Sequence, residues 1–177
     1  MAEITIGNPA VTGPGTSTAA GYTIIDRNSP ATGSGTLVQA KLFAKTDMLG
    51  VKVGTFYLVG ANRLRCRGAV VIPETVLAGA ERSYLVALPV MEGDFFGCYA
   101  ESGGMAYSSN GEVGMYYMQG DLCTESAEGA VNTSANYKYS MGGVGETAAV
   151  ITCQTLPATD LTSEGATLHG SATGLSE

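Results

Sequence analysis

The chain has 177 residues, a formal net charge of −7 and only 14% charged residues, beside 45% hydrophobic residues and 25 glycines. Nine Lys and Arg residues cannot cover several long helices with polar faces, nor form the dense positive surface that gains from binding nucleic acid. We therefore expect one main all-β domain with a short appendage, few helices, and no nucleic-acid partner.

The N-terminal segment combines strand-like pieces with turn residues. Met1-Ala-Glu-Ile-Thr-Ile-Gly lacks the basic and apolar regions of a secretory signal, so no signal peptide is expected in this chain. Residues 8–36 are rich in Pro, Gly, Ser, Thr and Ala, with strand-like pieces at 21–26 and 35–40. The pattern predicts strands alternating with turns, and an irregular N-terminal arm over 1–35 is the alternative.

Clear strands follow at 36–44 and 51–59, each bounded by turn residues. Alternation in the second places Val51, Val53, Thr55, Tyr57 and Val59 on one face and Lys52, Gly54, Phe56 and Leu58 on the other. Both faces are largely apolar near its end, which is typical of a strand inside a sandwich.

A turn at 60–63 leads to a hairpin partner at 64–72. Its alternation directs Leu64 and Cys66 inward, and Arg63, Arg65 and Arg67 outward.

Short strands at close intervals continue to the end of the main domain. They are expected at 81–89, 94–100, 104–107, 113–117 and 137–141, separated by turns that contain glycine. This spacing predicts an antiparallel β-sandwich, jelly-roll-like, over residues 1–153. One arguable helix lies at 73–79, where a loop serves equally well. The apolar stretch 70–90 is not expected to span a membrane, because Pro73 and three charged residues interrupt it.

The central stretches resemble β-sandwich modules of phage and bacterial surface proteins. The resemblance rests on Val51-Lys-Val-Gly-Thr-Phe-Tyr-Leu-Val, Leu64-Arg-Cys-Arg, Gly93-Asp-Phe-Phe-Gly-Cys-Tyr and Gly120-Asp-Leu-Cys. The Gly-Asp steps are similar to those that open buried strands in jelly-roll and lectin-like sandwiches. The similarity covers roughly residues 36–125 and implies the fold more than the function.

The segment 154–177 is similar to the start of a fibronectin type III-like repeat. It reads Gln154-Thr-Leu-Pro-Ala-Thr-Asp-Leu-Thr-Ser-Glu-Gly-Ala-Thr-Leu-His-Gly-Ser-Ala, and continues to Glu177. The resemblance implies a strand with a kink at Pro157 and an anchor at Leu161, then a second strand holding Ala166, Leu168 and Gly170. Such a piece cannot bury a core alone. The native chain continues, or these strands pack on their own domain, or they pair with a neighbouring subunit.

Residues with the chemistry of enzymes or metal sites are sparse. His169, the single histidine, lies in the appendage. Loop acids such as Glu92 with Asp94, or Glu125 with Glu128, have no separation fixed by the sequence. No C-x-x-C pair occurs among the four cysteines, Cys66, Cys98, Cys123 and Cys153. They are either buried free thiols or disulfide partners, and three disulfide connectivities are then possible. No catalytic residue, cofactor or metal is expected.

Two groups of side chains are candidates for an interface. Arg63, Arg65 and Arg67 could grip a carboxylate or phosphate, or the acidic patch of a neighbouring subunit, and a solvated strand face is the favoured alternative. Tyr116, Tyr117, Tyr137 and Tyr139 could anchor a protein interface or stack on sugar rings, with about half of the tyrosine set in the core.

These features favour a non-enzymatic structural or display protein. We expect a virion component, such as a phage capsid decoration, head fibre or tail-associated subunit, or another extracellular assembly, with protein subunits as partners. The alternative is a carbohydrate-binding module of a surface or secreted protein, with glycans as partners. The expected location is a virion or an extracellular surface, without membrane insertion.

Overall fold

A computed structural model describes residues 2–8, 15–17, 20–109, 113–147, 152–155, 159–162, 165–167 and 170–173. The chain divides into two compact units, 2–147 and 148–177, each described by itself. The described regular structure consists of β-strands without helices, arranged in antiparallel sheets. The predicted all-β, antiparallel sandwich-like fold is confirmed.

The first sheet of the larger unit is organised around one long strand. Its strands are β1 (Glu3–Asn8), β2 (Gly15–Ser17), β4 (Gly35–Leu49), β7 (Glu81–Val90), β9 (Ser102–Ser108), β13 (Lys138–Tyr139) and β14 (Met141–Thr147). The order is β1-β14-β4-β9-β13, with β7 paired to β4 and β2 paired to β9. The first half of β4 pairs with β14 and β7, and its second half pairs with β9.

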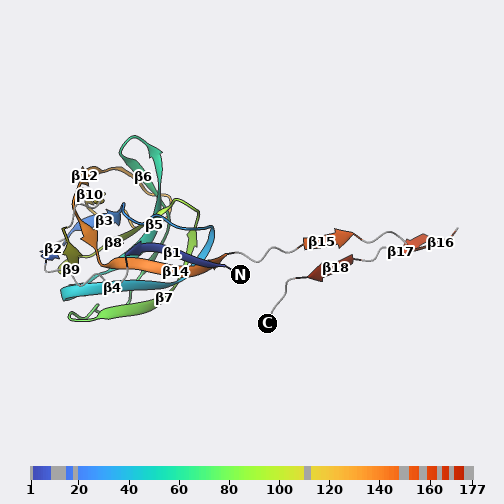
Figure 1. The fold of residues 1–177 in the computed structure, drawn as a ribbon, viewed down its shortest axis with the longest axis horizontal. Helices are drawn as coiled ribbons and strands as arrows, with labels where there is room; N and C mark the ends of the chain where they lie inside the picture. The colour runs from blue at the N-terminus through green and yellow to red at the C-terminus, as the bar shows by residue number, and fades with distance from the viewer. Residues whose placement is uncertain are drawn as a thin grey trace. The chain divides into compact units, whose positions relative to one another are not determined.

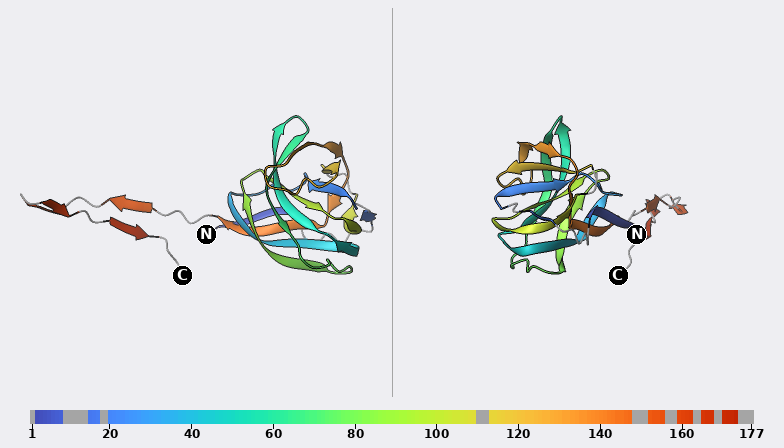
Figure 2. Two further views of the ribbon diagram at one scale, coloured as in Figure 1. Left: turned by 180° about the vertical axis from the view of Figure 1, so that it is seen from behind. Right: turned by 60° about the vertical axis from the view of Figure 1, so that its left-hand side comes forward.

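The second sheet curls until it is nearly closed. Its strands are β3 (Tyr22–Asp26), β5 (Lys52–Gly60), β6 (Arg63–Val71), β8 (Phe95–Tyr99), β10 (Met115–Gln119), β11 (Glu128–Ala130) and β12 (Asn132–Ser134). The order is β11-β6-β5-β8-β3-β10-β12. Because only Val131 separates β11 from β12, the chain itself brings the two edges together. The strands therefore curve round into a barrel-like sheet (Figure 2).

Two hydrophobic clusters pack on the two faces of the curled sheet. The larger lies between the sheets, with Leu37 and Leu42 from β4 against Val53 from β5 and Phe96 from β8. The smaller lies on the other face of the curled sheet, where Phe56 packs with seven further buried residues, which are Ile25, Leu64, Cys66, Tyr116, Leu122, Cys123 and Val131. Strand β5 therefore buries both faces, as its apolar pattern predicts.

The end of β5 departs from the sequence expectation. Leu58 is 47% exposed and Val59 39% exposed, although both were predicted to lie inside a sandwich. Pairing between β5 and β8 ends at Phe56, so the β5–β6 hairpin continues beyond its neighbour and projects from the sheet (Figure 1). The hairpin itself, with Leu64 and Cys66 buried, agrees with the prediction.

Three further differences concern local structure. The alternative prediction of an irregular arm over 1–35 is wrong for the described strands of this segment. Strand β1 pairs with β14, and β3 lies between β8 and β10. The segment 73–79 is a loop and not a helix. Its residue Val76 forms an isolated antiparallel β-bridge with Met48 of β4. The strand expected at 137–141 is the short β13 followed by β14, which runs on to Thr147 because it pairs with both β1 and β4.

The smaller unit contains two short antiparallel ladders. Strand β15 (Thr152–Thr155) pairs with β18 (Gly170–Thr173), and β16 (Thr159–Thr162) pairs with β17 (Gly165–Thr167). Pro157, Leu168 and His169 lie outside the described residues. Two-stranded ladders are marginally stable in water without a packed layer.

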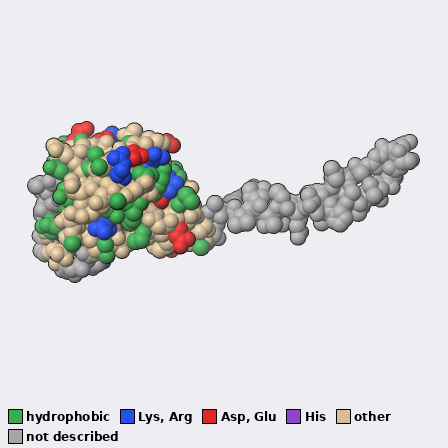
Figure 3. All heavy atoms as spheres, turned by 90° about the horizontal axis from the view of Figure 1, so that it is seen from above, with side chains coloured by type: hydrophobic (Ala, Val, Ile, Leu, Met, Phe, Trp, Pro, Cys, Tyr) green, Lys and Arg blue, Asp and Glu red, His purple; other side chains and the backbone are tan. Residues whose placement is uncertain are grey.

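Polar uncharged side chains and backbone cover much of the face shown in Figure 3, with Lys, Arg, Asp and Glu gathered in small groups. Among the described residues, no helix is long and apolar enough to cross a membrane.

Candidate functional site

The outward arginines of β6 bind carboxylates of the same chain. Strand β11 places Glu128 opposite Arg65 and Ala130 opposite Arg63. Arg63 donates from Nε and Nη2 to Oε1 of Glu128, at 2.9 and 2.7 Å, and Arg65 donates from Nε and Nη2 to Oε2, at 3.2 and 2.6 Å. The hydrogen bonds from both guanidinium groups lower the pKa of Glu128.

Arg67 makes a more buried ion pair than the other two arginines. Its Nε and Nη2 donate to the carboxylate of Asp94 at 2.5 and 2.9 Å, and the Asp94 side chain is only 3% exposed. The guanidinium also lies 4.4 Å from the centre of the Tyr57 ring. Asp94 accepts a further hydrogen bond from the backbone N–H of Met91, at 2.8 Å. This pair therefore joins β6 to the turn before β8.

The arginine row consequently has intramolecular partners along its whole length. Arg63 and Arg65 keep about half of their side-chain surface exposed, at 53% and 43%. They could still meet a partner, but any acidic group would compete with Glu128 for the same donors.

The four candidate tyrosines divide into two places. Tyr116 is buried, stacks edge-on against Phe95 and lies under the Arg27 guanidinium, while Tyr117 is half-buried. Tyr137 and the buried Tyr139 pack with Tyr107, with ring centres 5.2 and 5.6 Å from that of Tyr107. At most Tyr117 and Tyr137 present part of their surface, so these rings mainly stabilise the fold.

A buried polar network lies beside the aromatic groups. Asp26 is 1% exposed and accepts hydrogen bonds from Asn8 Nδ2, Asn28 Nδ2 and the backbone N–H groups of Asn28 and Ser29, at 2.6 to 3.0 Å. Asn28 Nδ2 also donates to the carbonyls of Gly114 and Tyr137. Burial raises the pKa of Asp26, and the hydrogen bonds oppose that rise. The network ties β1 and β3 to two distant loops.

The described cysteines are buried free thiols. Burial raises the pKa of Cys66 to about 11 and of Cys98 to about 12, and it also raises the pKa of Cys123. The side chain of Cys153 lies outside the described residues. Within the described part of the chain, no three His, Cys, Asp or Glu side chains come together as a metal site would require.

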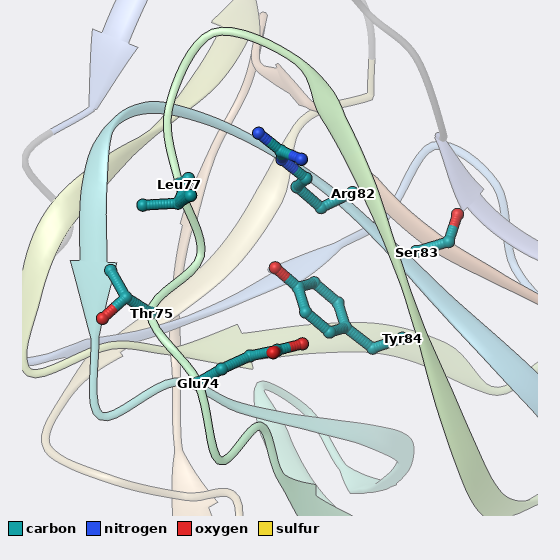
Figure 4. A pocket seen from close by; sticks show the side chains of 6 residues that line it. All are labelled: Glu74, Thr75, Leu77, Arg82, Ser83 and Tyr84. Atoms are coloured by element: carbon teal, nitrogen blue, oxygen red, sulfur yellow. The ribbon is translucent and has the colours of Figure 1, made fainter.

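A pocket of about 240 Å³ lies between the loop 73–79 and the start of β7. Its lining residues are Glu74, Thr75, Leu77, Arg82, Ser83 and Tyr84. In Figure 4 the Glu74 carboxylate extends toward the Tyr84 side chain, whose hydroxyl points to the side of the pocket where Leu77 and Arg82 lie. The hydroxyl of Ser83 points to the other side of the strand, as alternation along β7 requires.

The same strand also presents an apolar edge. In the described part of the chain β7 pairs with β4 on one side, and Leu85 at its middle is 89% exposed. The six residues Ser83-Tyr-Leu-Val-Ala-Leu88 contain no charge, proline or glycine. A long neutral edge of this kind is a template for pairing with another strand.

No protein-family model and no curated protein matches the chain. The physical properties of its surfaces must therefore guide the functional interpretation.

Sequence reasoning missed both the pocket and the β7 edge. The pocket joins two segments, 74–77 and 82–84, that belong to a loop and a strand with no shared motif. The edge had a stronger signal, because Ser83–Leu88 is a neutral, β-prone stretch. Its position at the border of a sheet depends on which strand pairs with β4, and that pairing is a property of the topology.

Proposed function

We propose that this protein is a non-enzymatic structural subunit that assembles through the edge of strand β7. The observation that carries this proposal is the exposure of Leu85, 89% of whose surface is accessible on an edge of ten residues. Natural sheets commonly blunt such edges with lysine, proline or a bulge, because they otherwise recruit further strands. In β7 the proline, Pro89, lies near one end, and the irregular pairing with β4 falls between Leu85 and Leu88, so the regularly paired stretch Ser83–Leu85 carries neither device.

The outer face of the first sheet continues from the β7 edge across three neighbouring strands. Leu85 pairs with Gln39 of β4, Gln39 pairs with Val144 of β14, and Val144 pairs with Thr5 of β1. Val38, which lies in the irregularity of β4 opposite β14 and beside Gln39, is 45% exposed. A second copy that adds a strand to β7 would extend this face and place its own side chains beside Leu85. We therefore assign the partner as another copy of this chain.

The location of such an assembly follows from the resemblances alone. Sandwich modules of phage and bacterial surface proteins, and fibronectin type III-like repeats, are used for display outside cells. We therefore place the assembly on a virion, as a capsid decoration, head fibre or tail-associated subunit. A bacterial surface assembly is the alternative location.

Sedimentation velocity of the full chain tests the assembly. The wild type should sediment as an oligomer at a concentration of tens of micromolar, whereas Leu85→Lys should sediment as a monomer, because a lysine on an edge strand disfavours pairing with a further strand. Leu58→Lys is the matched control, since Leu58 is an exposed leucine on the β5–β6 hairpin, and it should remain oligomeric. A monomeric wild type, or two variants that behave alike, would contradict the proposal. Negative-stain images showing rings, trimers or filaments would then define its symmetry.

A further inference from the structure

The pocket at the start of β7 carries two exposed charged side chains, Glu74 and Arg82. Neither Glu74 nor Arg82 makes an ion pair or a side-chain hydrogen bond with any described residue, although Lys52, Arg63, Arg65 and Arg67 all do. The two groups are close enough to influence Tyr84. Burial and the charge of Glu74 raise the pKa of the Tyr84 hydroxyl, while Arg82 lowers it. The pocket therefore offers an acceptor and a donor without partners among the described residues, beside the ring of Tyr84, which packs against the larger hydrophobic cluster.

The wall opposite β7 is held in place before any ligand arrives. Val76 is fully buried and exchanges two backbone hydrogen bonds with Met48, each 3.0 Å long. The backbone N–H of Gly79 donates to the carbonyl of Ala44, and that of Ala78 donates to the Asp47 carboxylate. The loop is thus fixed to β4 along its length, so binding would not require the loop to become ordered first.

The composition of the pocket limits the chemistry of its ligand. A phosphate would face the carboxylate of Glu74, and a divalent cation would face the guanidinium of Arg82 with a single carboxylate to bind it. A purely apolar ligand would leave both charged groups without partners. A neutral molecule with adjacent hydroxyl groups can accept from Arg82 and donate to Glu74, and its C–H face can pack on Tyr84 and on Leu77, which is 49% exposed.

We propose that this pocket binds one saccharide ring, with Arg82 and Glu74 holding its hydroxyl groups and Tyr84 and Leu77 contacting its apolar face. The volume of about 240 Å³ is below the usual range for larger ligands and suits a single ring. Affinity for a ligand this small should be weak, with a Kd on the order of 1 mM. The pocket adjoins the edge proposed for assembly and shares Ser83 and Tyr84 with it, whereas Glu74, Leu77 and Arg82 lie outside the six residues of that edge.

Titration of the full chain with glucose, galactose, N-acetylglucosamine and mannose, followed by amide NMR shifts, tests this site. At least one sugar should shift residues 74–84 and saturate. Arg82→Gln, Glu74→Gln and Tyr84→Ala should each weaken binding by about tenfold, because each removes a charge-assisted hydrogen bond or a ring contact to the sugar. Lys45→Gln, which changes an exposed lysine on β4, should bind as the wild type does.

Other outcomes would overturn the saccharide assignment. These are no saturable shift with any sugar, shifts that persist unchanged in the three pocket variants, or tighter binding of inorganic phosphate or acetate than of the sugars. The fold of each variant is checked from its amide spectrum. A glycan array then distinguishes a free monosaccharide from a residue within a polysaccharide chain. Because the readout is local to residues 74–84, a monomeric wild type would disprove assembly without affecting this test.

Discussion

Charged side chains in this protein stabilise contacts between segments that are distant in the sequence. Arg67 and Asp94 are 27 residues apart, yet they form a bidentate pair in which the carboxylate is 3% exposed. Removal of one partner would leave the other charge largely desolvated, which costs more than the net contribution of the intact pair. The Arg67 guanidinium is thus mainly a structural group, although outward alternation on β6 also made it a candidate for an interface.

The buried carboxylate of Asp26 provides a prediction about pH. Its pKa is raised by burial above the ordinary value of 3.8, so the folded protein binds this proton more tightly than the unfolded chain does. The contribution of Asp26 to the free energy of unfolding should therefore fall as the pH rises from about 3.8 through the raised pKa, and stay constant above it.

Asp26→Asn lacks this titration and should also be less stable by about 1–3 kcal/mol, because its Nδ2 cannot accept the hydrogen bonds that the backbone N–H groups of Asn28 and Ser29 donate to Oδ2 of Asp26. Urea unfolding of both proteins from pH 3 to 7 measures the difference. The stability advantage of the wild type should shrink with rising pH, and an advantage that grows instead would show that the hydrogen bonds dominate the pKa.

At the level of elements, the curled sheet depends on a close approach between β8 and the Phe56 side chain of β5. A Cβ atom added to Gly97 would lie 2.5 Å from the Phe56 ring and 2.7 Å from Ile25. Because Gly97 has no side chain, Phe56 and Ile25 of the smaller hydrophobic cluster can occupy this space.

We expect Gly97→Ala to lower the free energy of unfolding by about 1–3 kcal/mol, because the ring and Ile25 must move in a closely packed region. Gly60→Ala is the matched control, since the nearest atom to its added Cβ is 4.0 Å away, and it should change stability by less than about 0.5 kcal/mol. Urea unfolding measures both variants. Equal effects would mean that packing around Phe56 adjusts without cost.

At the level of the whole molecule, the two units differ in what they can bury. Both hydrophobic clusters of the described residues lie between Ile4 and Met141. The unit 148–177 contributes two short ladders, each with two strands. Ladders of this size are not independently stable.

A chain that ends at Thr147 should therefore unfold cooperatively with the same midpoint and the same denaturant dependence as the full chain, within error. The peptide 148–177 alone should show no cooperative transition. Circular dichroism during urea titration measures both. A truncated chain that unfolds at clearly lower urea would reveal that the smaller unit stabilises the larger one.

Most strands could be predicted because pleating and turn chemistry act over a few residues. Val51–Val59 and the hairpin that follows show the required alternation, and glycine marks most of the turns. Strand β1, over Glu3–Asn8, was missed as an element of the sheet, because its partner β14 lies more than 130 residues away. No local signal reports such a pairing.

The sequence alone therefore determined the all-β class, the β5–β6 hairpin, the burial of Leu64 and Cys66, and the outward direction of Arg63, Arg65 and Arg67. These properties follow from side-chain periodicity and turn residues, which are local. Only the tertiary structure decided that the second sheet nearly closes, that the arginines meet Glu128 and Asp94, that β7 lies at an edge, and that Glu74 and Arg82 share a pocket. Each of these depends on which distant strands exchange backbone hydrogen bonds, and many pairings are compatible with the same alternation.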